Sequence, residues 1–133
     1  MESVILDSSV WIALERNDSE SRKYLNREYQ ILMPAMVWAE LKYASISSQR
    51  DVSARQTAFD FLARIQSLTD FVSMDRVVAE HYSELNEFCI SQGKPRAVSD
   101  LIIAATARAL DAALVSYDRR ARFEELPNLR VIN

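Results

Sequence analysis

Four acidic residues, spread over the whole chain, are the residues best able to do chemistry together. They are Asp7, Glu40, Asp100 and Asp118. Asp7 and Asp118 each follow a short apolar run, as expected for residues at the end of a buried strand. Several carboxylates at one place, with no cation to neutralise them, are the oxygen ligands that divalent ions such as Mg²⁺ prefer. The set therefore predicts a metal site.

Each of these acids, taken alone, also has an ordinary structural explanation. Asp7 could cap a helix, and Asp100 could stabilise a helix N-terminus through the macrodipole. Glu40 could be solvated on a helix flank, and Asp118 could be a turn residue. Asp75 also follows an expected strand and precedes an expected helix, and we interpret it as an N-cap. Position after a strand does not separate it from Asp7.

Composition excludes several classes of site. The chain has 133 residues, of which 49% are hydrophobic, and we expect a single domain over residues 1–133. One cysteine (Cys89) and one histidine (His81) exclude a disulfide framework and zinc sites of several Cys and His ligands. A single glycine (Gly93) disfavours phosphate-binding loops, so we expect no nucleotide cofactor. Neither a secretory signal nor a membrane span is expected, and the protein is predicted to be cytoplasmic.

The elements that must position the four acids alternate between strands and helices. Strands are expected at 4–6, 31–33, 71–74, 113–115 and 129–132. Helices are expected at 10–14, 36–45, 53–68, 76–92 and 100–110. This alternation predicts an α/β fold, with a mostly parallel sheet of four to five strands covered on both faces. Sites in such sheets form beyond the carboxyl ends of the strands, where the acids are expected to meet.

Four segments of the chain resemble, in order, those of the PIN-domain ribonucleases, and most closely the VapC-like toxins of toxin–antitoxin pairs. The segments are 4–12, 36–41, 99–107 and 114–118, and each contains one of the four acids. The resemblance covers nearly the whole chain. It implies a PIN-like three-layer α/β/α fold, RNA cleavage that depends on Mg²⁺ or Mn²⁺, and neutralisation by a cognate antitoxin protein.

The resemblance also implies roles for individual residues. Asp7, Asp100 and Asp118 would ligate the metal, and Glu40 would bind a metal-bound water or a second ion. The hydroxyl groups of two serines would orient the carboxylates or a water, namely Ser8 and Ser116. Related chains often carry a further acid just before a Phe. Here Arg122 precedes Phe123, and the nearest acid, Glu124, follows it.

Basic residues flank the expected site, although the formal net charge of the chain is −3. The candidates for contact with RNA phosphates are Arg119, Arg120, Arg122, Lys94 and Arg96. A solvated basic turn is an equally simple interpretation of these residues. The broad apolar stripe of the helix at 53–68, with Trp38 and Leu41, is the expected groove for an antitoxin segment or a homodimer contact, and a homodimer is expected.

Two other functions fit part of the pattern. A receiver-like signalling domain would use acids after its first and third strands, here Asp7 and Asp75, to form a phospho-accepting pocket. Ser8 and Ser9 stand where such a domain has a second acid. A catalytically silent PIN-like binding module is the other alternative, and the presence of all four acids disfavours it.

Overall fold

Five short apolar strands form one sheet in the computed structural model, which describes residues 1–132. The strands are β1 (Glu2–Leu6), β2 (Tyr29–Pro34), β3 (Asp70–Val72), β4 (Ala113–Val115) and β5 (Val131–Ile132). Their order across the sheet is β3-β2-β1-β4-β5, and every neighbouring pair is parallel. The two runs Val4 to Leu6 and Ala113 to Val115 are almost completely buried, which explains their continuous apolar sequence.

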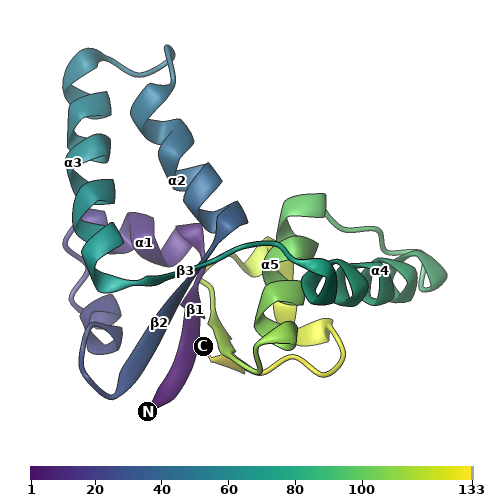
Figure 1. Ribbon diagram of the computed structural model, residues 1–133. Coiled ribbons are helices and arrows are strands. Elements are labelled where there is room, and N and C mark those ends of the chain that lie inside the picture. The colour runs from purple at the N-terminus through teal and green to yellow at the C-terminus, as the bar shows by residue number, and fades with distance from the viewer. Residues whose placement is uncertain (133) are drawn as a thin grey trace.

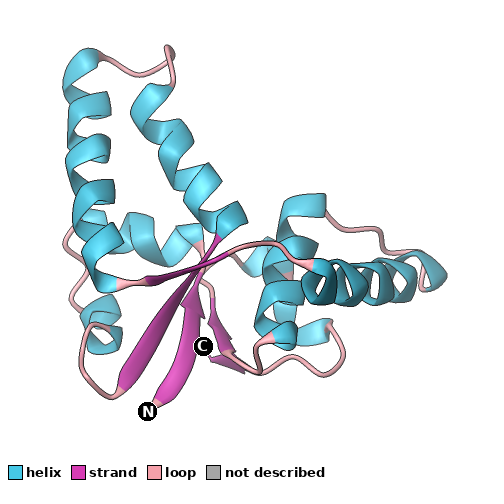
Figure 2. Cartoon of the chain, in the orientation of Figure 1, coloured by secondary structure: helices cyan, strands magenta, loops and turns pink. Residues whose placement is uncertain are grey.

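Helices cover both faces of this sheet (Figure 1; Figure 2). The α-helices are α1 (Ser8–Glu15), α2 (Ala35–Ile46), α3 (Val52–Leu68), α4 (Arg76–Ser91) and α5 (Val98–Ala109). Three short 3₁₀ helices complete the chain: η1 (Glu20–Tyr24), η2 (Arg119–Ala121) and η3 (Phe123–Glu125). The chain moves from β1 outward to β3 through α1, α2 and α3, and returns to β4 through α4 and α5. Right-handed crossovers therefore place these two groups of helices on opposite faces.

The register of the sheet brings the ends of β1 and β4 to the same level. Leu6 pairs with Val115, and the amide of Asp7 donates to the carbonyl oxygen of Val115 at 3.0 Å. Asp7 and the turn that begins at Ser116 therefore leave the sheet side by side. This is the edge at which the sequence predicts a site.

The parallel α/β/α architecture expected from the sequence is confirmed, and the differences are local. The strand expected to continue to residue 74 ends at Val72, and the last strand begins at Val131 rather than at residue 129. Both are edge strands with a single neighbour, so pairing limits their length. The three 3₁₀ helices were not expected, because such short turns carry no hydrophobic periodicity. Helix α5 begins two residues before Asp100, which therefore lies in its first turn.

The strand order also removes one alternative function. Receiver-like domains have the order 2-1-3-4-5, in which the strand after the first helix is at the edge. Here β3 is the edge strand, and the exposed Asp75 that follows it caps α4 by accepting from the amide of Val78 at 3.0 Å. The N-cap interpretation of Asp75 is confirmed, and the receiver interpretation is wrong. Among residues 1–132, no helix combines the length and the apolar character needed to cross a membrane.

Candidate metal centre

Asp7 is the centre of the site and its most buried acid, with 5% of its surface exposed. Its Oδ1 accepts from the amides of Ser9, at 3.0 Å, and Val10, at 3.4 Å, so it does cap α1. The Ser9 hydroxyl also donates to Oδ1, and the Ser116 hydroxyl donates to Oδ2. Burial nevertheless raises the pKa of Asp7, and these hydrogen bonds oppose the rise only in part. Asp7 is therefore a helix cap and a desolvated acid at once.

Two serine hydroxyls join Asp7 to the turn after β4. Ser9 Oγ accepts from the amide of Tyr117 at 2.9 Å, and Ser116 Oγ accepts from the amide of Asp118 at 3.0 Å. Each hydroxyl thus donates to Asp7 and is itself fixed by the main chain of the neighbouring turn. The sequence predicted the contribution of Ser116 but not that of Ser9.

Glu40 and Asp100 approach Asp7 from two further helices, α2 and α5. Partial burial raises the pKa of Glu40, and the carboxylates of Asp100 and Asp7 raise it further, while a hydrogen bond from Ser8 opposes the rise. Burial also raises the pKa of Asp100, as do the carboxylates of Asp118 and Asp7. These mutual effects mean that the four acids from four separate segments share one electrostatic environment, as the sequence predicted.

Asp118 completes the group from the exposed side of the site. Its carboxylate accepts from the amide of Arg120 at 3.0 Å and caps η2. It lines a cavity of about 310 Å³ together with Ser116, Arg119 and Glu124, so the acid that follows Phe123 does face the same space as Asp118. Asp118 is therefore both a turn residue and a member of the acidic group.

The donor set has the chemistry of a site for a hard divalent cation. Four carboxylates contribute only oxygen ligands, and of the cations around them Arg96 is the one that lowers the pKa of Asp100. In residues 1–132, no three acidic, histidine or cysteine side chains are arranged to hold a metal ion as they stand. Carboxylates of like charge repel one another, which agrees with side chains that stand apart.

The basic residues near the site divide into two groups. Lys94, Arg119, Arg120 and Arg122 are exposed, and Arg119 lines the same cavity as Asp118. Arg96 is different, because its side chain is only 7% exposed and its guanidinium is bound to main-chain carbonyls and to a carboxylate. The expectation that Arg96 contacts RNA phosphates does not fit this burial, since both of its Nη atoms are already bound by the protein.

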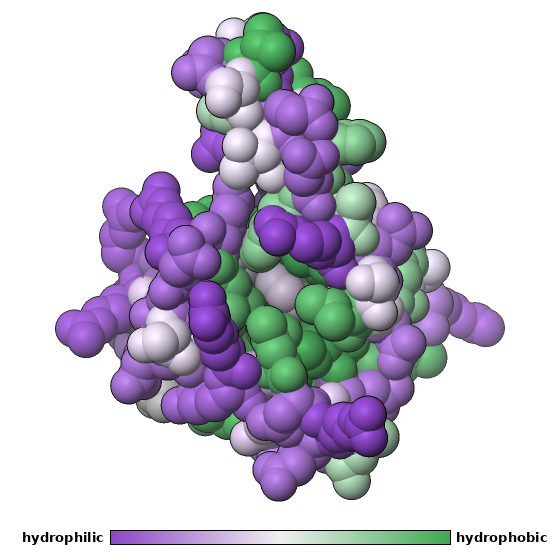
Figure 3. All heavy atoms as spheres, turned by 90° about the vertical axis from the view of Figure 1, so that its left-hand side faces the viewer, coloured by the Kyte–Doolittle hydropathy of each residue, from purple (hydrophilic) through white to green (hydrophobic). Residues whose placement is uncertain are grey.

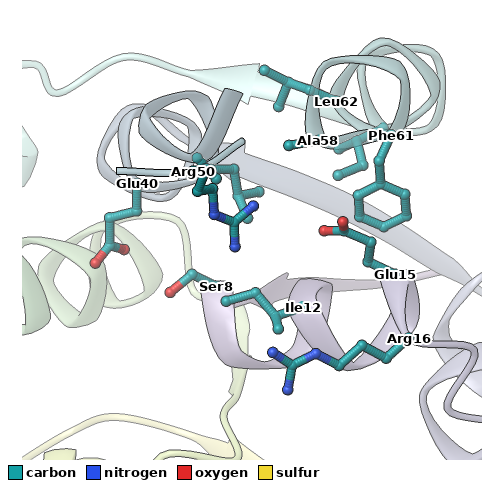
Figure 4. A pocket seen from close by; sticks show the side chains of 12 residues that line it. Ser8, Ile12, Glu15, Arg16, Glu40, Arg50, Ala58, Phe61 and Leu62 are labelled. Atoms are coloured by element: carbon teal, nitrogen blue, oxygen red, sulfur yellow. The ribbon is translucent and has the colours of Figure 1, made fainter. Parts of the chain in front are cut away.

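A groove leads away from Glu40 across the face formed by α1, α2 and α3. Its near end is a cavity of about 140 Å³ with Ser8 and Glu40 at its mouth (Figure 4). A second cavity, of about 420 Å³, continues it and shares Glu15, Phe61 and Ile65 with the first. Figure 3 shows this face as an apolar hollow with a polar rim. We call the two cavities together the α1–α3 groove.

The apolar stripe of α3 is divided between the core and this groove. Ile65 and Leu62 are buried, whereas Leu68 is 52% exposed. Leu41 lines the near cavity, as expected. Trp38 does not line it: the indole packs edge-on against Phe71, with ring centroids 6.3 Å apart, on the side of β3. The expected groove therefore exists without Trp38.

Comparisons with known proteins agree with this architecture. The family model described as the PIN domain matches residues 4–129. The sequence matches no curated protein. The fold is similar to that of VapBC2 from Rickettsia felis bound to a promoter DNA fragment (21% identity, TM-score 0.86, 98% of both chains covered). It is also similar to DNA-bound VapBC from Salmonella typhimurium (21% identity, TM-score 0.83, 99% of this chain and 98% of that chain).

A third solved structure is described as a member of the VapBC family of toxin–antitoxin systems, VapBC-5 from Mycobacterium tuberculosis. It is 19% identical to this chain, with a TM-score of 0.79, and the match covers 100% of this chain and 99% of that chain. At such identities the likeness concerns the fold, and the chemistry must be argued from the residues.

Proposed function

This chain belongs to the PIN domain family, and we propose that it is a divalent-metal-dependent endoribonuclease that acts as the toxin of a toxin–antitoxin pair. The observation that supports this proposal most strongly is the convergence of four carboxylates at the carboxyl end of a parallel sheet, where three of them have raised pKa values. Such perturbed acids cluster at functional sites more often than at structural ones.

The cofactor in this proposal is Mg²⁺ or Mn²⁺. Asp7, Asp100 and Asp118 would hold it, because they come from three different segments and can surround an ion. When bound, such an ion can activate a water and stabilise the charge that develops on a hydrolysed phosphodiester. The protein then needs fewer acid and base groups of its own, which agrees with a chain that has one histidine, far from these acids in sequence.

The remaining residues would orient the reacting groups. Ser9 and Ser116 fix the two oxygens of Asp7. Oδ1 also accepts from the amides of Ser9 and Val10, whereas Oδ2 accepts from Ser116 alone and keeps a lone pair for a ligand. Ser8 holds Glu40. Glu40 would orient the attacking water, and its raised pKa would make its carboxylate the stronger base for the proton of that water.

The RNA would approach over the exposed basic residues beside Asp118. Arg119, Arg120, Arg122 and Lys94 are accessible, and cations in this position contact phosphates without reading the base sequence. Arg96 is omitted from this set because its side chain is nearly buried and both of its Nη atoms are bound by the protein.

The partner in this proposal is an antitoxin whose segment lies in the α1–α3 groove. The groove has an apolar floor and four arginines along it, Arg16, Arg22, Arg50 and Arg64. Within residues 1–132 none of the four forms an ion pair. An amphipathic segment with apolar anchors and acidic flanks fits these properties. The similar solved structures are described as VapBC complexes, which supports a partner of this kind.

A catalytically silent PIN-like module is the remaining alternative. It would not need four converging acids, because their mutual repulsion destabilises a protein that makes no use of them. The homodimer expected from the sequence stays a prediction, which light scattering after gel filtration would test.

The direct test is an RNA cleavage assay with Mg²⁺, with Mn²⁺ and with a chelator. Asp7→Asn should abolish cleavage, whereas Asp75→Asn should retain it. The two residues are a matched pair, because each follows a strand and caps a helix, but only Asp7 belongs to the acidic group. Cleavage by Asp7→Asn at the wild-type rate, or full activity in the presence of chelator, would refute the proposal.

A further inference from the structure

Arg96 is one of the most enclosed charged side chains of the protein, with 7% of its side chain exposed. Its Nη1 donates to the main-chain oxygens of Ala121 and Arg122, the latter at 3.0 Å. Its Nη2 forms an ion pair with Glu125 Oε1 at 2.9 Å. The guanidinium thus supplies a donor to the Ala121 carbonyl at the end of η2, and a second donor to the Arg122 carbonyl, which also accepts from the amide of Glu125 at 3.1 Å.

The two sides of this contact belong to two different parts of the metal centre. Arg96 stands four residues before Asp100, in the segment that leads into α5. The carbonyls that it binds follow Asp118 by three and four residues, in the turn that Asp118 itself begins. The guanidinium is therefore a direct bridge between the segment that carries Asp100 and the segment that carries Asp118.

Holding the turn in the protein does not by itself require this bridge. Phe123 and Leu126 anchor the same segment in the core, with 2% and 5% of their surface exposed. Arg122, whose own carbonyl is one of the two that Arg96 binds, has a left-handed conformation with φ of 46°. The apolar anchors fix where the segment lies, while the planar donor fork of Arg96 fixes the orientation of the turn that leads back to Asp118.

We propose that Arg96 is a positioning residue of the metal centre, which sets the position of the Asp118 carboxylate relative to that of Asp100. This inference rests on the proposed metal site, but not on the identity of the substrate. It gives Arg96 a task other than the RNA contact expected from the sequence.

A positioning role for Arg96 and simple electrostatics predict opposite changes in metal affinity when Arg96 is removed. A cation beside a cluster of acids repels a metal ion, so removal of its charge should, by Coulomb's law alone, tighten metal binding. If Arg96 positions the ligands, its removal should weaken binding instead. The conservative change to lysine keeps the charge but loses the fork that reaches two carbonyls and a carboxylate together. R96K therefore separates the effect of lost geometry on metal affinity from the effect of lost charge.

The experiment is a titration of the purified full chain with Mn²⁺ alone, followed by calorimetry and by the electron paramagnetic resonance of free Mn²⁺. The variants are R96Q, R96K and E125Q. R108Q is the matched control, since Arg108 is also nearly buried, at 10%, and pairs with Glu84 at 2.8 Å near the opposite end of α5. The thermal unfolding of each variant is recorded, so that changes in affinity can be compared with changes in stability.

We expect R96Q to bind Mn²⁺ about tenfold more weakly than the wild type, as for other groups that orient metal ligands. R96K should lose part of the affinity, while E125Q, which keeps the carbonyl contacts, and R108Q should stay within about twofold. Affinities of R96Q and R96K within about twofold of the wild type, or tighter binding by R96Q, would overturn the proposal. If R96Q does not fold, R96K decides alone. A wild-type chain that binds no Mn²⁺ would instead refute the proposed metal site.

Discussion

Ser9 joins two segments of the acidic site through a single hydroxyl group. Its hydroxyl donates to Asp7, and the same oxygen accepts from the amide of Tyr117 at 2.9 Å. It therefore connects the start of α1 with the turn after β4. A group that both holds a ligand and joins two segments should matter for chemistry more than for stability.

We predict that Ser9→Ala lowers the rate of RNA cleavage by about tenfold or more, because Asp7 loses one of the two hydroxyls that orient it. The loss should appear in kcat and in the affinity for Mn²⁺. The control is Ser83→Ala, which removes a hydroxyl that only bonds the carbonyl of Ala79 within α4. Equal activities of Ser9→Ala and Ser83→Ala would show that the Ser9 hydroxyl has no role in orienting Asp7.

The sequence could identify Asp7 but not the hydroxyls around it. Ser8 and Ser9 are adjacent and chemically identical, and only the direction in which α1 leaves β1 decides which one turns toward Asp7 and which toward Glu40. Local sequence also cannot separate Asp75 from Asp7. It shares the local pattern of Asp7, and the difference arises from strand order, which places β1 at the centre and β3 at the edge.

The turn from Arg119 to Arg122 is the element that we assign to RNA binding. Its three arginines are exposed and follow a predicted metal ligand. Each phosphate contact releases counterions, so its loss should appear in the salt dependence of binding. A turn that is basic only for solubility would leave this dependence unchanged.

We predict that changing Arg119, Arg120 and Arg122 together to Glu weakens RNA binding and reduces the slope of log K against log salt by up to about 2, at about 0.7 for each contact with single strands. Binding is measured by fluorescence anisotropy with the inactive Asp100→Asn background, to avoid cleavage. Arg55→Glu, on the distant α2–α3 hairpin, is the control and should leave the slope unchanged. An unchanged slope in the triple variant would refute the assignment.

The α1–α3 groove is the element that we assign to the antitoxin. Arg50 reaches into the near cavity from beyond α2, and Arg16 lies at the end of α1 on its other side (Figure 4).

We predict that Arg16→Glu with Arg50→Glu weakens binding of the co-expressed antitoxin at least tenfold, since like charges would then face its acidic flanks. Arg76→Glu, on α4, is the control. Binding is measured by calorimetry, and unchanged affinity of the double variant would show that this face is not the antitoxin site.

The gathering of acids at one edge of the sheet lowers the stability of the whole folded protein. Burial and neighbouring carboxylates raise the pKa values of Asp7, Glu40 and Asp100. The folded protein therefore holds protons that the unfolded chain has already released, at any pH between the ordinary values and the raised ones. In this window the stability of the metal-free protein falls as pH rises. The parallel sheet and its buried strands must supply the stability that this edge removes.

Asp100 is the best position at which to test this cost, because within residues 1–132 the shift in its pKa arises from burial and neighbouring charges and from no hydrogen bond to its carboxylate. The positive end of α5 favours a negative charge there by about 0.3–1 kcal/mol. Against this attraction, burial and the carboxylates of Asp118 and Asp7 raise the pKa of Asp100, and the nearby Arg96 opposes that rise only in part. We therefore expect the negative charge of Asp100 to destabilise the metal-free protein.

We predict that Asp100→Asn raises the melting temperature of the metal-free protein by about 2–5 °C at neutral pH. The gain should shrink as pH falls toward 3.8, the ordinary pKa of Asp, and vanish below it, where the wild-type carboxyl is protonated in both the folded and the unfolded state. Excess Mn²⁺ should reverse the order, since it stabilises only a protein that binds it. Differential scanning fluorimetry with chelator or Mn²⁺ measures both effects. Asp75→Asn is the control, and a less stable Asp100→Asn protein in chelator would mean that the acids do not burden the fold.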